Sequence, residues 1–105
     1  MKVIIDNKVH NIIDEFYEYA RQRHAALDPH TIIYKILRIY DELEKLGNYA
    51  FVCPHSRLKK DWIAKGYKEC IIEDFHFAFQ LFHDDTTQEC YVYVQDACHS
   101  LLYHE

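Results

Sequence analysis

The sequence predicts an α+β domain: a short N-terminal strand, then an antiparallel two-helix hairpin packed on one face of a mainly antiparallel sheet. Three observations predict it. Apolar residues recur at helical spacing in the first half of the chain, they alternate with a period of two residues after residue 75, and only two Gly and two Pro residues interrupt the chain. Half of the 105 residues are hydrophobic, which suffices for one core at this length. We therefore expect a single domain over residues 1–105.

The N-terminal half predicts one strand and two helices. Residues 3–5 are β-branched and apolar, and turn-forming residues follow them. In residues 9–24 the apolar side chains fall on one helical face. A second apolar stripe follows Asp28 and Pro29, which are typical of a helix start, and ends before Gly47, which is typical of a helix end. Because few residues join the two helices, they should form an antiparallel hairpin.

The C-terminal half predicts a meander of strands. Residues 49–65 show no clear period, and Pro54 argues against a central strand, so we expect an irregular or weakly extended segment there. The period then becomes two residues. The candidate strands are residues 67–73, 75–82 and 90–95, with turn-forming residues at 84–87.

The alternation also predicts which side chains share a face. The helices should cover the apolar set, which comprises Phe77, Phe79, Leu81, Cys90, Val92 and Val94. These numbers are odd on one strand and even on the next, so paired residue numbers must sum to an odd value. The opposite face then carries His76, Ala78, Gln80, Tyr91, Tyr93 and Gln95. Such a face is suited to stacking and hydrogen bonding, although an ordinary solvated sheet face has a similar composition.

Composition favours a cytoplasmic protein that binds no membrane. No apolar run approaches the roughly 18 residues that a membrane span needs, and the first residues are too few for a signal sequence. The four Cys residues are therefore expected to be reduced thiols, and no Cys-x-x-Cys spacing indicates zinc. The net charge of −5 is unfavourable for nucleic-acid binding, but residues 57–68 carry a local charge of +4, which leaves −9 for the remainder.

Two segments carry a resemblance to a known family. Residues 66–79 begin with Gly-Tyr and contain the turn Asp74-Phe75-His76. They resemble the RelE/ParE toxin motif, in which a Gly-Tyr strand enters an Asp-Tyr-Arg turn and continues into a third strand. Upstream, the Arg-Leu-Lys-Lys of residues 57–60 is similar to the basic segment that precedes the sheet in this family.

The C-terminal segment extends the resemblance. Residues 94–103 look like the closing strand of RelE/ParE toxins, in which an Arg usually precedes a terminal Tyr by four positions. His99 takes the Arg position and Tyr103 keeps the Tyr; His76 likewise stands where Arg is expected, and Glu69 stands near another expected Arg. The expected order of strand, two helices and a meander of strands also resembles that of RelE/ParE toxins over nearly the whole chain.

The resemblance implies the toxin of a type II toxin–antitoxin system, or a divergent homologue. RelE members are ribosome-dependent mRNA endonucleases that a cognate antitoxin protein wraps and neutralises. Their chemistry has the ribose 2′-OH attack the adjacent phosphate, which requires proton transfer and stabilisation of the charged intermediate. No cofactor or metal is implied.

Each site residue then has an expected role. His76 would be a hydrogen-bond donor or general acid on the sheet face left open by the two helices. His99 would be an acid or base beside the scissile phosphate, since histidine exchanges protons near neutral pH and arginine does not. Tyr103 would stack on a base or orient the phosphate. The expected RNA-binding residues are Arg57, Lys59, Lys60, Tyr91 and Tyr93.

Two alternatives remain open. The first is a non-catalytic protein-binding module on the same fold, either ParE-like and directed at a protein such as a gyrase, or an inactive homologue; the loss of arginines favours it over a robust nuclease. The second is a metal-binding protein that uses His76, His99 and the cysteines. It ranks last, because Cys70 and Cys90 are expected to face the core.

Overall fold

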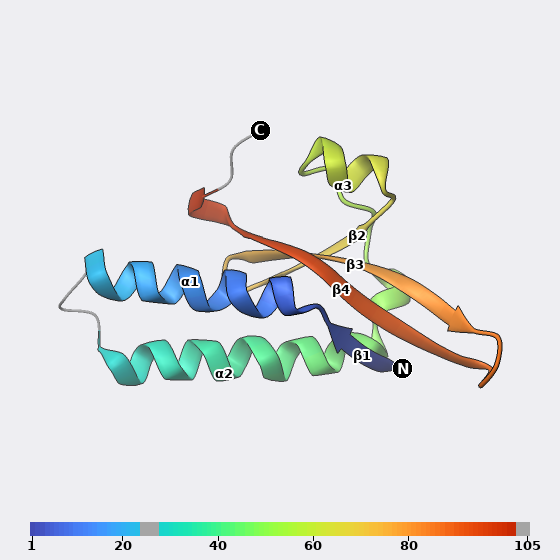
Figure 1. The fold of residues 1–105 in the computed structure, drawn as a ribbon, viewed down its shortest axis with the longest axis horizontal. Helices are drawn as coiled ribbons and strands as arrows, with labels where there is room; N and C mark the ends of the chain where they lie inside the picture. The colour runs from blue at the N-terminus through green and yellow to red at the C-terminus, as the bar shows by residue number, and fades with distance from the viewer. Residues whose placement is uncertain (24–27, 103–105) are drawn as a thin grey trace.

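The computed structural model describes residues 1–23 and 28–102 and confirms the α+β class. Its four-stranded sheet has the order β1-β4-β3-β2, and two antiparallel helices cover one face (Figure 1). The strands are β1 (Lys2–Ile5), β2 (Lys68–Ile72), β3 (Phe75–Asp84) and β4 (Glu89–His99), and the helices are α1 (Asn7–Arg23), α2 (Pro29–Lys45) and the short α3 (Lys60–Ala64). β1 is parallel to β4, whereas the β3–β4 and β2–β3 pairs are antiparallel. None of the described helices is long and apolar enough to cross a membrane.

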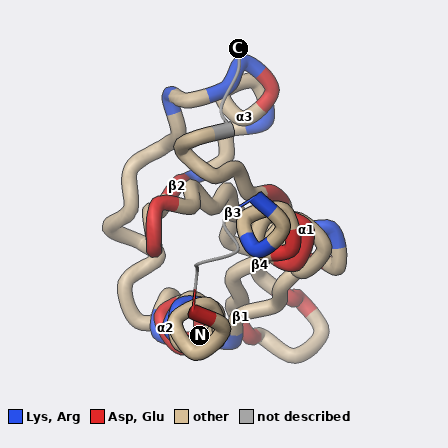
Figure 2. Tube along the Cα trace, turned by 90° about the vertical axis from the view of Figure 1, so that its left-hand side faces the viewer, with Lys and Arg blue, Asp and Glu red and all other residues tan. Residues whose placement is uncertain are grey.

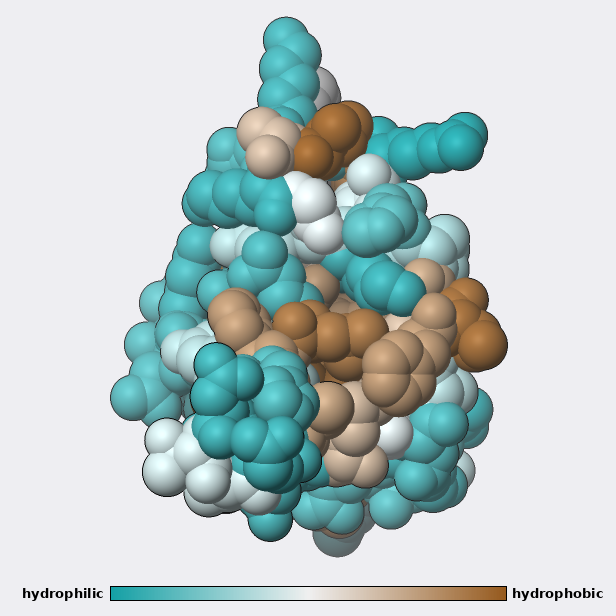
Figure 3. Space-filling view, turned by 90° about the vertical axis from the view of Figure 1, so that its right-hand side faces the viewer, coloured by the Kyte–Doolittle hydropathy of each residue, from teal (hydrophilic) through white to brown (hydrophobic). Residues whose placement is uncertain are grey.

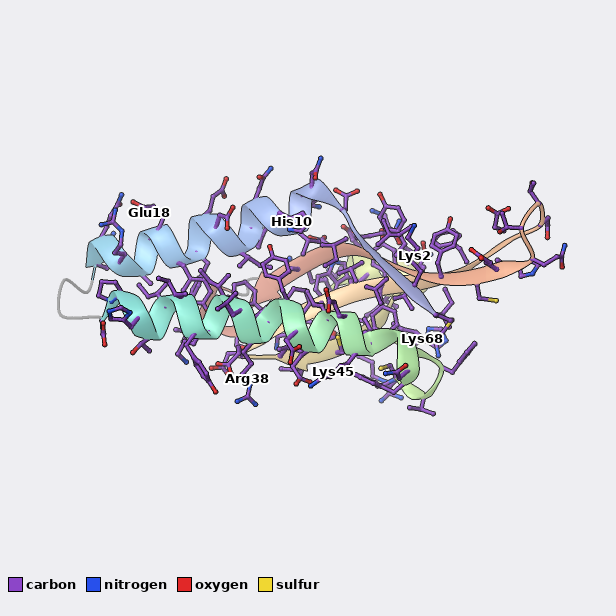
Figure 4. The ribbon with its side chains drawn as sticks, turned by 90° about the horizontal axis from the view of Figure 1, so that it is seen from below. Lys2, His10, Glu18, Arg38, Lys45 and Lys68 are labelled. Atoms are coloured by element: carbon purple, nitrogen blue, oxygen red, sulfur yellow. The ribbon has the colours of Figure 1, made fainter. Side chains whose placement is uncertain are left out.

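The two long helices form where their apolar stripes and capping residues predict them. Asp28 is the N-cap of α2 and its Oδ1 accepts a hydrogen bond from the His30 backbone N–H at 3.0 Å, with Pro29 in the first helical position. The predicted end of the first helix near His24 lies outside the described residues. Figure 4 shows α1 and α2 side by side, with Arg38 and Lys45 on α2. The helices and the sheet share one core that includes Val9, Ile13, Tyr17, Ile32, Ile39, Leu43, Phe75, Phe77, Phe79, Val92 and Val94.

A β-bulge divides the β3–β4 hairpin into two registers. From Phe79 to the hairpin turn, paired numbers sum to an odd value, as in Phe79 with Val94, so the predicted parity is confirmed there. Between Ala78 and Phe79 the register shifts by one residue, which leaves Gln95 as the extra residue of β4. Beyond the bulge the sum is even, and Phe75 pairs with His99. A shift of one residue moves every later side chain of β4 to the other face.

The predicted irregular segment 49–65 contains a helix, and this helix covers part of the face that was expected to be open. Trp62 of α3 is fully buried and forms a second, smaller core with Tyr67, Ala78 and Cys98. Its indole N–H donates to Asp96 Oδ2 at 2.9 Å. Five helical residues are too few to show a periodic pattern, so the sequence reasoning missed α3. The sheet is consequently covered by α1 and α2 on one face and in its middle by α3 on the other (Figure 1).

The four cysteines are free thiols in different surroundings. Cys70 packs against the main core, and burial raises its pKa to about 12, so it stays protonated. Cys90 was expected to face the core, but it is exposed because it lies near the hairpin turn, beyond the reach of the helices. Cys98 belongs to the second core. Within the described residues no group of three or more His, Cys, Asp and Glu side chains could hold a metal ion.

Candidate acid–base site

His76 lies at the start of β3, on the sheet face opposite α1 and α2, between two polar partners. Its Nδ1 is 2.9 Å from Glu69 Oε2 on β2, and its Nε2 is 3.1 Å from Ser100 Oγ just after β4. An ionised carboxylate only accepts hydrogen bonds, so Nδ1 carries a proton and donates to Glu69. This leaves Nε2 as the ring atom that exchanges a proton. The side chains of His76 and Glu69 are each 16% exposed, so the pair is sheltered but accessible.

The other carboxylate oxygen of Glu69, Oε1, also accepts a hydrogen bond. The Ser56 hydroxyl donates to Glu69 Oε1 at 2.7 Å and accepts from the Leu58 backbone N–H at 3.2 Å. Ser56 is buried, so the carboxylate is fixed on both sides. A carboxylate fixed in this way orients the imidazole, as in Ser-His-Asp sites.

A pocket of about 620 Å³ adjoins this carboxylate. Its lining residues are Pro54, His55, Ser56, Arg57, Ile63 and Glu69. Arg57 thus lines the same pocket as Glu69. Lysine and arginine residues also lie on α3 and in the segment before it (Figure 2), so this part of an acidic protein carries positive charge.

The turn between β2 and β3 fixes Ser100. Glu73 and Asp74 both have positive φ, at 50° and 67°, which gives the tight two-residue turn that suits a hairpin. The Asp74 carbonyl accepts from the Ser100 backbone N–H at 2.9 Å and from the Ser100 hydroxyl at 2.8 Å. Glu73 is held against α2 by Lys35 at 3.3 Å and Arg38 at 3.0 Å. The main helix layer therefore braces the turn that positions Ser100.

His99 does not join His76, because the bulge turns it to the helix face. It is only 8% exposed, its ring stacks on Phe16 of α1 with centroids 3.8 Å apart, and it meets Phe75 edge-on. Its Nδ1 accepts from the Leu101 backbone N–H at 3.1 Å. Burial is the largest cause of its lowered pKa, which favours the neutral ring. His76 and His99, both expected at one catalytic site, therefore lie on opposite faces of the sheet, because one extra residue in β4 reverses the side of His99.

The predicted RNA-binding residues fall into two groups. Arg57 lies at the pocket, and the Lys59 ammonium lies 5.4 Å from the centroid of the Trp62 ring on α3, as part of the same basic segment as Lys60. Tyr91 and Tyr93 share the face of Gln80, as predicted, but near the hairpin turn. Tyr91 stacks on Phe82, with ring centroids 5.5 Å apart. Phe82 lies six residues along β3 from His76, which is a distance of roughly 20 Å in a strand. Tyr103 lies outside the described residues.

Sequence reasoning missed Glu69, Ser56 and Ser100 as site residues. Glu69 and His76 lie on neighbouring strands, and their closeness follows from the two-residue turn, which pairs Ile71 with His76. A Glu-x6-His spacing across a hairpin is the one signal that could have suggested the pair. Ser56 and Ser100 come from a loop and a strand end, and nothing local in the sequence marks them.

No protein-family model, curated protein or solved structure matches the chain.

Proposed function

We propose that this protein is a divergent toxin of the RelE/ParE type that acts on RNA, with His76 as its proton-transfer residue. The observation that carries the proposal is the hydrogen-bonded His76–Glu69 pair on the face opposite the long helices, beside a pocket lined by Arg57. The order of strand, two helices and three strands agrees with the order that the resemblance implies. Arg57 and Glu69 line one pocket, and the basic segment from Arg57 onward offers charge for a phosphate.

Cleavage of RNA by its own 2′-OH needs proton transfer and charge stabilisation. A ribose hydroxyl that takes the place of the Ser100 hydroxyl at His76 Nε2 would give its proton to that nitrogen as the 2′ oxygen bonds to phosphorus. The P–O5′ bond would then break, and Nε2 would return the proton to the departing 5′ oxygen. Glu69 would act as a positioning residue, because its hydrogen bond fixes the ring and the tautomer of His76. Arg57 would bind the phosphate, for which its planar guanidinium is well shaped.

The test is translation arrest together with RNA cleavage. The wild-type protein added to a cell-free translation system should stop translation and leave new RNA 5′ ends. His76→Ala should reduce cleavage about 100- to 10,000-fold, the range that acid–base residues supply. His99→Asn keeps an acceptor for the Leu101 N–H and should retain activity. Full cleavage by the His76→Ala protein would refute the role of His76.

A second candidate, a non-catalytic protein-binding module, is supported by an apolar surface. Figure 3 shows a band of apolar side chains on the face at the hairpin end of the molecule. At this end Phe51 and Val52 of the 3-10 segment η2 (Ala50–Val52) are 65% and 82% exposed, and Phe82 is 38% exposed. Exposed apolar residues that gather in this way are typical of protein interaction sites.

In the nuclease candidate this surface binds the antitoxin, whereas in the protein-binding candidate it binds the protein target, so the two candidates give different results. Replacing Phe51 and Val52 by Ser should weaken antitoxin binding but leave RNA cleavage unchanged. If His76→Ala still arrests growth and Phe51→Ser with Val52→Ser does not, the protein acts through a protein target. Arrest of replication while translation continues would point to the same conclusion.

A further inference from the structure

Ser100, His76 and Glu69 together have the connectivity of a serine-nucleophile site. Ser100 Oγ is 3.1 Å from His76 Nε2, and His76 Nδ1 is 2.9 Å from Glu69 Oε2. These are the two contacts that define a nucleophile, its base and the group that orients the base, and such sites occur on unrelated folds in any chain order. Ser56 adds a further hydrogen bond to the carboxylate.

We infer that Ser100 is an activated nucleophile that takes up acyl or phosphonyl groups from activated esters, with His76 as its base. The inference goes beyond RNA cleavage, because it concerns a hydroxyl of the protein rather than one of the substrate. It uses the same imidazole nitrogen, so a ribose 2′-OH and the Ser100 hydroxyl would compete for Nε2.

The reaction balances without any further reagent. The Ser100 hydroxyl rotates from the Asp74 carbonyl, 2.8 Å away, to Nε2 and gives up its proton as Oγ bonds to the carbonyl carbon of the ester. The bond from that carbon to the leaving oxygen breaks, and His76 returns the proton to the leaving alcohol. Water then attacks the acyl-serine with the same base, which releases the acid and restores Ser100.

The surroundings indicate the class of substrate. Ser100 is exposed, and two exposed apolar side chains border the site: Leu101, the next residue, at 79% exposure, and Ile71, the strand partner of His76, at 61%. Short, uncharged acyl groups fit such a border.

The backbone limits the rate that can be expected. The N–H of Ser100 donates to the Asp74 carbonyl and that of Leu101 donates to His99 Nδ1, so both are engaged and neither is aimed at an oxyanion. Loss of one oxyanion donor costs about 100- to 1,000-fold in known hydrolases. We therefore expect covalent labelling and slow ester turnover rather than efficient hydrolysis.

Labelling of the full chain with a fluorophosphonate probe, followed by intact mass and peptide mapping, tests the inference. Wild-type protein should gain one phosphonyl group on Ser100, with loss of fluoride. Ser100→Ala should not be labelled, His76→Ala should be labelled at least 100-fold more slowly, and Glu69→Gln should be intermediate. Thr86→Ala removes an exposed hydroxyl in the distant hairpin turn and should be labelled at the wild-type rate.

Two further measurements keep each result interpretable. Far-UV circular dichroism shows whether His76→Ala is folded, and added imidazole should restore part of its labelling if the ring acts as a base. Labelling of Ser56 or a tyrosine in place of Ser100, or an unchanged rate in folded His76→Ala, would overturn the inference. RNA cleavage is scored separately on the wild-type protein: labelling of Ser100 without RNA cleavage supports this inference and refutes the proposed function, and cleavage without labelling does the reverse.

Discussion

Truncation of Trp62 should release α3 and cost a large part of the protein's stability. Trp62 is fully buried, and removal of a buried tryptophan side chain costs about 3–5 kcal/mol. Trp62→Phe keeps most of the ring contact but loses the hydrogen bond to Asp96, which is worth about 1.5–3 kcal/mol for a charged acceptor. Because Asp96 also contacts Lys8 at 3.3 Å, we expect the lower end of that range. Domains of this size have a total free energy of unfolding of about 5–15 kcal/mol.

Urea denaturation followed by circular dichroism measures these free energies. Ile63, the next residue on α3, is 53% exposed, so Ile63→Ala is a matched control that should cost under about 1 kcal/mol. Trp62 is the only tryptophan of the chain, so its fluorescence in the wild-type protein reports α3 while circular dichroism reports the whole fold. A loss below about 1 kcal/mol for Trp62→Ala, or a loss equal to that of Ile63→Ala, would refute the burial of this residue against the sheet.

Three other perturbations have definite expected outcomes. Because the pKa of His99 is lowered in the folded state, the folded protein binds fewer protons than the unfolded chain below about pH 6.5. The free energy of unfolding should therefore be unaffected by His99 above about pH 6.5 and should fall as the pH drops from 6.5 toward the lowered pKa. Urea titrations at several pH values should show that His99→Asn removes this dependence on pH. Gly47→Ala would place a Cβ 2.0 Å from the Met1 carbonyl oxygen, so it should lower the melting temperature and weaken amide protection in β1, and an unchanged melting temperature would contradict the close contact. The Tyr93 hydroxyl donates a hydrogen bond to Asp6 Oδ2 at 2.7 Å, and this bond is the largest cause of the lowered pKa of Asp6. Tyr93→Phe should therefore move the pKa of Asp6 up toward 3.8 in a carboxyl NMR titration, and an unchanged pKa would argue against the bond.

The fold could be predicted from the sequence wherever local pattern and tertiary packing agree. The two long helices have apolar stripes and the second has an Asp-Pro start, and β3 and β4 alternate on either side of a turn. The alternation in these two strands correctly predicts that Gln80, Tyr91 and Tyr93 share one face. Only the long, periodic elements carry enough repeats to be recognised in this way.

The remainder depends on features that leave little trace in the sequence. A single extra residue, Gln95, reverses the second half of β4, and nothing in its composition marks a bulge. The resemblance places the turn at Asp74-Phe75-His76, whereas it falls at Glu73 and Asp74, which have positive φ without glycine. His76 was flagged by its place in the family motif, whereas Ser100 reaches it only because the bulge and this turn bring the strand ends together.

The most direct test of the central claim, that His76 and not His99 faces the proposed reaction surface, is a nuclear Overhauser experiment on the aromatic ring protons. We expect strong contacts between the rings of His99 and Phe16, whose centroids are 3.8 Å apart, and none between the rings of His76 and Phe16. Contacts from the His99 ring to Trp62 of α3, with none to Phe16, would place both histidines on one face and contradict the claim.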